Sequence, residues 1–150
     1  MTICFDTNVF GYAIDETAGS RHVTALEIVE RALRSQAAVL ILQTLAEFYT
    51  IATRKLETSP EEARLFLAGL RTTLPVYAAA EIDLDKAIDG ALRQGLSFWD
   101  ALLWATADRI GVRYLITEDF QDGRVLGGVT FVDPFRGENE RLLAEILPSP

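Results

Sequence analysis

The sequence predicts a single α/β domain whose strands form a mostly parallel sheet. Short apolar runs of strand length alternate along the chain with longer stretches in which apolar residues recur at helical spacing. This alternation is typical of a parallel sheet covered by helices. The chain has 150 residues, of which 49% are hydrophobic and 24% charged, so residues 1–150 can bury the core of one domain. No repeat, low-complexity tract or linker divides it.

Five short apolar runs account for the predicted strands. The clearest two are Tyr114–Ile116 and the β-branched run that ends directly before Asp133 and Pro134, because β-branched and aromatic residues favour extended backbone. The third of the five runs is the weakest. The predicted strands are Thr2–Phe5, Ala38–Ile41, Leu74–Ala78, Val112–Ile116 and Val129–Val132.

The segments between these runs have helical periodicity. The strongest start is Ser59-Pro60-Glu61-Glu62, which combines a capping serine, a proline in the first turn and acids at the positive end of the helix dipole. The predicted helices are Ser20–Gln36, Thr44–Glu57, Ser59–Thr72, Leu84–Gln94, Phe98–Ile110 and a short Glu138–Ile146.

The composition excludes several classes of protein. Lys and Arg total 14 against 22 Asp and Glu, which gives a net charge of −8. Such a chain has no general attraction for nucleic acids or anionic membranes, so a polyanionic substrate would need a local source of positive charge. The only cysteine, Cys4, and the only histidine, His22, exclude cysteine clusters and multi-histidine zinc sites. We expect Cys4 to be a buried structural thiol and His22 to lie at the surface.

We also expect a soluble, cytoplasmic protein without a membrane span. The N-terminal residues lack the basic and long apolar regions of a signal peptide. No apolar stretch reaches the roughly 18–20 residues that a membrane-spanning helix needs.

Acidic residues follow two of the predicted strands. Asp6 comes directly after Thr2–Phe5, and Asp119 follows Val112–Ile116 by three residues. The ligand site of a parallel sheet lies beyond the carboxyl ends of its strands, so these two carboxylates are expected to share one crevice. Two helix-borne acids, Glu47 and Asp100, could join them.

Each of these acids also has a structural explanation. Asp6 could cap a helix that starts at Thr7. Thr44 with Glu47, and Ser97 with Asp100, fit the spacing of a capping box. Asp119 fits a turn. A salt bridge from Glu47 to Arg54 is a further alternative.

Asp100 favours the functional explanation. Its helical neighbours at i+3, i+4 and i+7 are Leu103, Trp104 and Ala107, so its carboxylate lies along the apolar stripe of its helix. A buried carboxylate needs a cation or a cage of hydrogen bonds. Four clustered carboxylates would bind a divalent cation, and oxygen ligands alone favour Mg²⁺ or Mn²⁺ over zinc. Such a centre can hydrolyse a phosphodiester.

Basic residues could hold flanking phosphates, although solvated helix surface is the favoured explanation for most of them. The candidates are Arg21, Arg54, Lys55, Arg93 and Arg113.

The order of these motifs resembles the PIN domain family, and within it the VapC ribonuclease toxins of prokaryotic toxin–antitoxin pairs. The resemblance covers residues Thr2 to Phe135. It is carried by Asp6-Thr7-Asn8, Glu47 early in a helix, Trp99-Asp100-Ala101, Thr117-Glu118-Asp119 and the closing Val132-Asp133-Pro134-Phe135.

This resemblance implies a three-layer α/β/α sandwich around a central parallel sheet and Mg²⁺- or Mn²⁺-dependent cleavage of RNA. It implies a homodimer and a cognate antitoxin that inserts a basic segment at the acidic site. The implied metal ligands, one of which would help to deprotonate water, are Asp6, Glu47, Asp100 and Asp119. The residues implied to support them by hydrogen bonds are Thr7, Asn8 and Thr117.

Two other functions remain open at this point. A catalytically degenerate, PIN-like interaction module would keep the fold without the reaction. A phosphatase-like phosphoryl-transfer enzyme would need a second acid two residues after Asp6, where Asn8 stands. Asp122 is an additional acid for which a turn is favoured, and Glu118 is expected to face solvent.

The remaining apolar features have two explanations each. Trp99 and Trp104 are expected in the core or in a dimer interface, and stacking of Trp99 on a nucleobase is the alternative. The helices that begin at Ser20 and Ser59 could form an apolar clamp for an antitoxin helix. Ordinary core packing explains them equally well.

Overall fold

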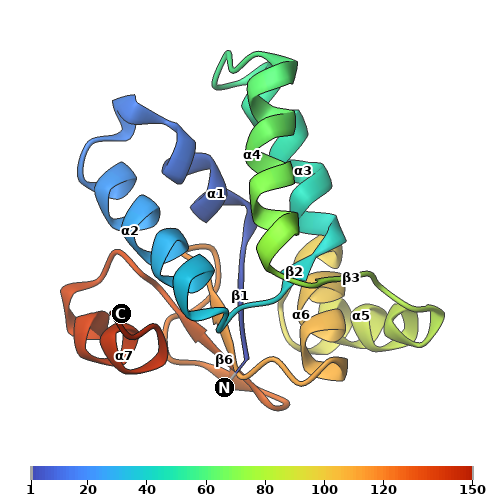
Figure 1. Cartoon of the computed structure of the whole chain (residues 1–150). Helices are drawn as coiled ribbons and strands as arrows, with labels where there is room; N and C mark the ends of the chain where they lie inside the picture. The colour runs from blue at the N-terminus through green and yellow to red at the C-terminus, as the bar shows by residue number, and fades with distance from the viewer. Residues whose placement is uncertain (1, 150) are drawn as a thin grey trace.

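A computed structural model describes residues 2–149, in which a central sheet is flanked by helices on both faces (Figure 1). The strands are β1 (Ile3–Phe5), β2 (Leu40–Ile41), β3 (Val76–Tyr77), β4 (Tyr114–Ile116), β5 (Val125–Leu126) and β6 (Val129–Val132). The α-helices are α1 (Thr7–Ile14), α2 (Ser20–Ser35), α3 (Leu42–Arg54), α4 (Pro60–Thr73), α5 (Glu81–Arg93), α6 (Phe98–Arg109) and α7 (Glu140–Ile146). Two short 3₁₀ turns cover Glu16–Ala18 and Gly137–Asn139.

The main sheet has the order β1-β4-β6-β5, and only the last pair is antiparallel. Strands β2 and β3 form a second parallel pair. An isolated bridge between Ile3 and Ala38 places the residues just before β2 beside β1, so the smaller pair continues the line of the main sheet. The predicted mostly parallel sheet is therefore confirmed.

Alternation along the central strands produces two cores, one on each face of the sheet. In β1, Ile3 and Phe5 belong to the core beneath α1 and α2, whereas Cys4 belongs to the core beneath α5 and α6. In β4, Ile116 and Leu115 divide in the same way, because successive strand side chains point to opposite faces. Two cores on one sheet make three layers, as the resemblance implied.

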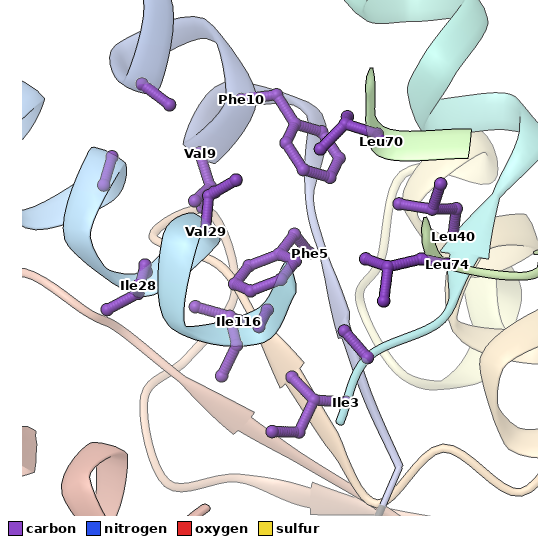
Figure 2. Packing of buried hydrophobic residues seen from close by; sticks show 14 of the residues in the cluster. Ile3, Phe5, Val9, Phe10, Ile28, Val29, Leu40, Leu70, Leu74 and Ile116 are labelled. Atoms are coloured by element: carbon purple, nitrogen blue, oxygen red, sulfur yellow. The ribbon is translucent and has the colours of Figure 1, made fainter. Parts of the chain in front are cut away.

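Aromatic side chains fill the larger of the two cores. Phe10 packs edge-on against both Phe5 and Phe48, with ring centroids 5.6 and 6.5 Å apart. Figure 2 shows part of this core, with side chains from α1, α2 and α4 around Phe5 of β1. Helices α3 and α4 lie side by side above it (Figure 1). The predicted burial of Cys4 is also confirmed.

Most elements begin or end a residue or more away from their predicted bounds, and three of these differences affect the site or the sheet. Helix α3 begins at Leu42 rather than Thr44, and the Thr44 hydroxyl donates to the carbonyl of Ile41, 2.8 Å away. Helix α5 begins at Glu81 rather than Leu84, because the Asp83 carboxylate accepts the N–H of Ala80 at 2.7 Å. The predicted strand Leu74–Ala78 contracts to β3.

Strand β5 falls in a segment expected to contain only turns. It pairs antiparallel with β6, and the two residues Gly127 and Gly128 connect the two strands. Gly127 has a φ of +56°, and a Cβ there would lie 2.6 Å from Oδ2 of Asp108. Hairpins of this length require positive φ values, so glycine is needed at this position.

No helix within residues 2–149 is both long and apolar enough to cross a membrane.

Candidate active site: a carboxylate cluster at the sheet edge

Asp6 is the most deeply buried member of the cluster, with 6% of its surface exposed. It joins β1 to α1 and caps that helix, since its Oδ1 accepts the N–H of Thr7 at 2.7 Å. Its Oδ2 accepts the hydroxyl of Thr117 at 2.8 Å. Thr117 follows β4, which is the parallel neighbour of β1, so the topology alone brings these two residues together. The capping and site explanations of Asp6 are thus both compatible with its position.

The pKa of Asp6 is raised to about 7. Burial is the largest cause, because desolvation disfavours the charged carboxylate, and the charges of Asp119 and Asp100 raise it further. The hydrogen bonds from Thr117 and Thr7 act in the opposite direction. The carboxylate is therefore held in place by two donors but lacks a compensating positive charge among the described residues.

Glu47 reaches the cluster from α3. Its Oε2 accepts the hydroxyl of Thr7 at 2.8 Å, and its Oε1 accepts the side-chain amide of Gln43 at 2.9 Å. Thr7 consequently connects two acids, since its N–H bonds to Asp6. No capping box involves Glu47, because α3 starts before Thr44, and no ion pair joins it to Arg54 within residues 2–149.

Asp100 lies in the first turn of α6. Its N–H donates to the Ser97 hydroxyl at 3.3 Å, so Ser97 caps the helix as the spacing predicted. The pKa of Asp100 is raised on balance: burial is the largest cause, a hydrogen bond between its carboxylate and the Ser97 side chain opposes the shift, and the charges of Asp119 and Glu47 add to it. The predicted apolar stripe is confirmed by the burial of Leu103 and Trp104 on the same helix.

Asp119 completes the group from the loop after β4. Its N–H donates to the Thr117 hydroxyl at 3.1 Å, and its carboxylate accepts the side-chain amide of Asn8 at 2.9 Å. The three residues expected to support the acids thus all contact them: Thr7 bonds to Asp6 and Glu47, Asn8 bonds to Asp119, and Thr117 bonds to both strand-end acids.

The arrangement has oxygen donors only, and its members act on one another electrostatically. Within residues 2–149, however, no group of three or more acidic, cysteine or histidine side chains lies closely enough together to hold a metal ion. The chemistry of the donors still suits Mg²⁺ or Mn²⁺. A nearby dication would also offset the repulsion that contributes to the raised pKa values of Asp6 and Asp100.

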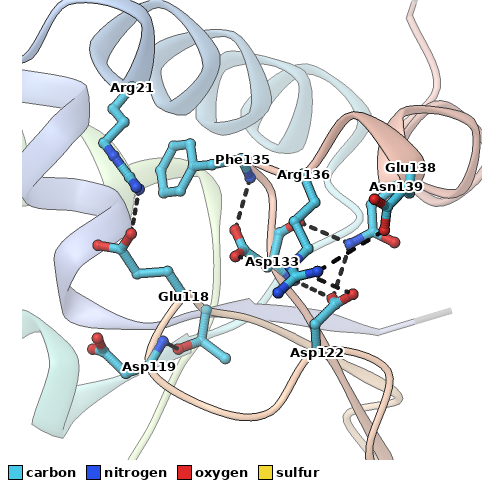
Figure 3. Close-up of polar contacts among 10 residues, drawn as sticks. Arg21, Glu118, Asp119, Asp122, Asp133, Phe135, Arg136, Glu138 and Asn139 are labelled. Atoms are coloured by element: carbon cyan, nitrogen blue, oxygen red, sulfur yellow. Dashed lines mark hydrogen bonds and ion pairs between the residues drawn. The ribbon is translucent and has the colours of Figure 1, made fainter.

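Glu118 does not face solvent, so that expectation was wrong. Its side chain is only 17% exposed and accepts a bond from the Tyr12 hydroxyl. It also accepts a bond from the Arg21 guanidinium (Figure 3). The Arg21 guanidinium lies 5.5 Å from the ring centroid of Tyr12 and 4.6 Å from that of Phe135. The hydrogen bond to Glu118 raises the pKa of Tyr12 to about 12. These contacts fix the residue that precedes Asp119.

Asp122 belongs to a separate network. Its carboxylate accepts the backbone N–H of Asp133 at 2.8 Å and the side-chain amide of Asn139 at 2.9 Å (Figure 3). Arg136 lies 3.6 Å from Asp133 and 4.0 Å from Asp122. This network ties the loop after β4 to the C-terminal segment, which agrees with the favoured structural explanation of Asp122.

Sequence reasoning missed Gln43. Its amide donates both to Glu47 and to the carbonyl of Trp99, at 2.9 Å each, so it links α3 to the start of α6. The i, i+4 spacing of Gln43 and Glu47 was the available signal. Of the two tryptophans, Trp104 is in the core as expected, whereas Trp99 is 61% exposed.

Comparisons with known proteins identify the family. Residues 3–123 match the PIN domain, while no curated protein sequence matches the chain. A toxin–antitoxin complex from Klebsiella pneumoniae is 26% identical, covers 89% of this chain and 98% of its own, and has a TM-score of 0.59. The toxin VapC20 of Mycobacterium tuberculosis, which cleaves the sarcin-ricin loop, is 22% identical over 78% of this chain and 89% of its own, with a TM-score of 0.59.

A third solved structure is DNA-bound VapBC from Salmonella typhimurium. It is 17% identical, covers 89% of this chain and 98% of its own, and has a TM-score of 0.65. The sequence match spans most of the chain, and the three-layer fold agrees with these structures. The protein therefore belongs to the PIN domain family.

Proposed function

We propose that this protein is a metal-dependent endoribonuclease that hydrolyses phosphodiester bonds in RNA. One observation carries the proposal: acids from four separate segments gather at one edge of the sheet without a basic partner among the described residues. The pKa values of Asp6 and Asp100 are raised by burial and by neighbouring carboxylates, which is typical of functional rather than structural acids.

The residues that would hold Mg²⁺ or Mn²⁺ are Asp6, Glu47, Asp100 and Asp119. When bound, the ion would neutralise charge on the phosphate and lower the pKa of a bound water. It would also supply the local positive charge that a chain of net charge −8 needs in order to accept a polyanion.

The chain's own polar groups position these acids. Asp6 accepts one hydrogen bond on each oxygen, which fixes the carboxylate plane and leaves further lone pairs on both oxygens. Asn8 orients Asp119, and Gln43 orients Glu47. One of the four carboxylates would help to deprotonate the attacking water.

We further propose that the protein is the toxin of a toxin–antitoxin pair, acts in the cytoplasm and forms a homodimer. The Klebsiella and Salmonella structures are toxin–antitoxin assemblies, and an acidic site on an acidic chain is complementary to a basic segment of an antitoxin. The antitoxin is expected from a reading frame that adjoins this one. Co-expression with that frame should relieve growth arrest, and light scattering of the purified chain should give twice the monomer mass.

The decisive experiment is digestion of total RNA by the purified protein. We expect cleavage with millimolar Mg²⁺, loss of cleavage with EDTA, and a fall of at least about 100-fold in Asp6→Asn and Asp100→Asn. Circular dichroism should show that both variants remain folded. Full activity of both variants, or equal activity in EDTA, would refute the mechanism.

Two alternatives have weaker support. A phosphatase-like enzyme needs an acid where Asn8 stands, and the Asn8 amide is engaged with Asp119. A degenerate interaction module has no need to retain four acids and their hydrogen-bonding partners. Absence of metal-dependent cleavage of any RNA would favour it.

A further inference from the structure

An apolar hollow of about 690 Å³ opens directly beside the carboxylate cluster. This size lies within the range of about 300–1,000 Å³ that small ligands occupy in proteins. Its polar members are Gln43 and Glu47, and no Lys or Arg lines it. Its apolar wall consists of Leu42, Ala46, Ala78, Ala79, Trp99 and Leu102.

Trp99 provides the flat aromatic face of this hollow. Its side chain is 61% exposed, although the residue immediately precedes the candidate ligand Asp100. The neighbouring tryptophan behaves differently, because Trp104 is buried and its indole N–H donates to the carbonyl of Leu126 at 3.0 Å. No such bond engages the Trp99 indole within residues 2–149.

The position of Trp99 is nevertheless fixed. The Phe98 ring packs edge-on against it with centroids 5.2 Å apart. The Gln43 amide donates to the Trp99 carbonyl at 2.9 Å and also to Glu47. The bonds of Gln43 hold the backbone of Trp99 next to Glu47, so the exposed side chain of Trp99 lies beside the carboxylates.

We propose that this hollow is a base-binding subsite, in which an unpaired nucleobase stacks on Trp99 while the adjoining phosphodiester lies over the carboxylates. The proposal rests on the proposed ribonuclease function and specifies its substrate as single-stranded RNA. The wall offers no cation to a phosphate and borders Glu47, so affinity at this point must come from the uncharged face of a base. A base held in a duplex cannot present that face, whereas an unstacked base can.

The test is steady-state cleavage of a short unpaired RNA by the wild-type chain and matched variants. Stacking on one aromatic side chain changes affinity by about 5- to 100-fold. We expect Trp99→Ala to raise KM by that factor with kcat nearly unchanged, and Trp99→Phe to restore most of the loss. The control is Leu65→Ala, because Leu65 is 73% exposed on α4 and lines no part of the hollow.

Abasic substrates identify the partner of the indole. An RNA that lacks one base next to the cleaved bond should raise KM for the wild type as much as Trp99→Ala does. The variant and the abasic RNA combined should give no further increase, since both remove the same contact.

The possible results distinguish a failure of the base-binding subsite from a failure of the proposed ribonuclease function. If the wild type cleaves RNA but Trp99→Ala keeps a wild-type KM, the subsite is wrong and the nuclease stands. If the two losses multiply, the indole contacts another part of the RNA, and the subsite is again wrong. A change in oligomeric mass in Trp99→Ala would show that a second copy covers the indole, which also overturns the proposal. If the wild type cleaves no RNA under any metal, the proposed function fails first.

Discussion

Buried acids occur in two regions of this molecule, and their pKa values are shifted in opposite directions in the two regions. Between α5 and α6, Asp83 is only 1% exposed, and its carboxylate accepts the Arg109 guanidinium at 2.9 Å. Burial would raise its pKa, but the bonds from Arg109 and Ala80 lower it on balance. At the sheet edge, Asp6 is similarly buried, but its nearest charges are other carboxylates and its pKa is raised to about 7.

The ion pair of Asp108 with Lys86 shows the same lowering of the pKa as that of Asp83 with Arg109. Asp108 accepts bonds from the Lys86 ammonium and the N–H of Gly128, and these contacts lower its pKa against the effect of burial. Among the described residues, Asp83 and Asp108 therefore each have a basic partner, whereas the acids at the sheet edge have none. This difference supports the proposal that the cluster at the sheet edge binds a cation.

The largest difference between the two regions is expected in how the free energy of unfolding depends on pH. A carboxylate with a raised native pKa binds protons more readily when folded, so its contribution to stability is lost as pH rises from about 4 to about 7. In EDTA, the free energy of unfolding of the wild type should fall by a few kcal/mol over this window relative to Asp6→Asn. The measurement is urea unfolding at a series of pH values, and parallel curves for the two proteins would contradict the raised pKa.

Neutralising a paired acid should have the opposite effect to neutralising a clustered one. In EDTA at neutral pH, Asp83→Asn should lower the free energy of unfolding by about 2–3 kcal/mol, because Arg109 loses its partner. Asp100→Asn should cause no loss. The exposed Asp89→Asn, whose pair with Arg93 spans 4.0 Å, is the control and should change stability by less than about 0.5 kcal/mol. Equal losses in the first two variants would remove the distinction between the regions.

Divalent metal should stabilise only through the unpaired cluster. At a Mg²⁺ concentration tenfold above Kd, binding to the native state adds about 1.4 kcal/mol, which raises Tm by about 3–6 °C for a chain of this size. Calorimetry should show this shift in the wild type and in Asp83→Asn, but not in Asp6→Asn. A wild-type Tm that does not respond to millimolar Mg²⁺ or Mn²⁺ would count against the metal site.

The smallest effect is expected at the contacts that hold Glu118. Tyr12→Phe removes one hydrogen bond to its carboxylate and should lower the free energy of unfolding by about 1 kcal/mol. RNA cleavage should remain within a few-fold of the wild type, since Arg21 still pairs with Glu118. Chemical unfolding and initial rates check both values. A loss as large as that of Asp6→Asn would place Glu118 in the catalytic machinery.

The sequence predicted the site best where its residues directly follow predicted strands. Asp6 and Asp119 could be placed in one crevice because each follows a parallel strand, and the apolar stripe beside Asp100 was readable from helical spacing. Glu47 entered the site mainly through the family resemblance. That these acids bind metal remains a prediction.

Other features depend on tertiary contacts that no local pattern encodes. Glu118 is only 17% exposed because it bonds to Arg21 and Tyr12, which are distant in the chain, so its position in a loop wrongly suggested a solvent-facing side chain. The role of Gln43 requires the carbonyl of Trp99, a residue on another helix. Strand β5 is only two residues long, which is too short for hydrophobic periodicity to detect, although its Gly127-Gly128 connection was a usable hairpin signal.

The hydroxyl of Thr117 has one consequence for how the cluster can move. A hydroxyl carries a single proton, and this one points toward Asp6, so the same oxygen must present a lone pair to the N–H of Asp119. Rotating the Thr117 side chain away would break both of these bonds at once. Asp6 and Asp119 are therefore coupled through the Thr117 hydroxyl oxygen. A movement of either residue would shift this oxygen and so alter the hydrogen bond of the other.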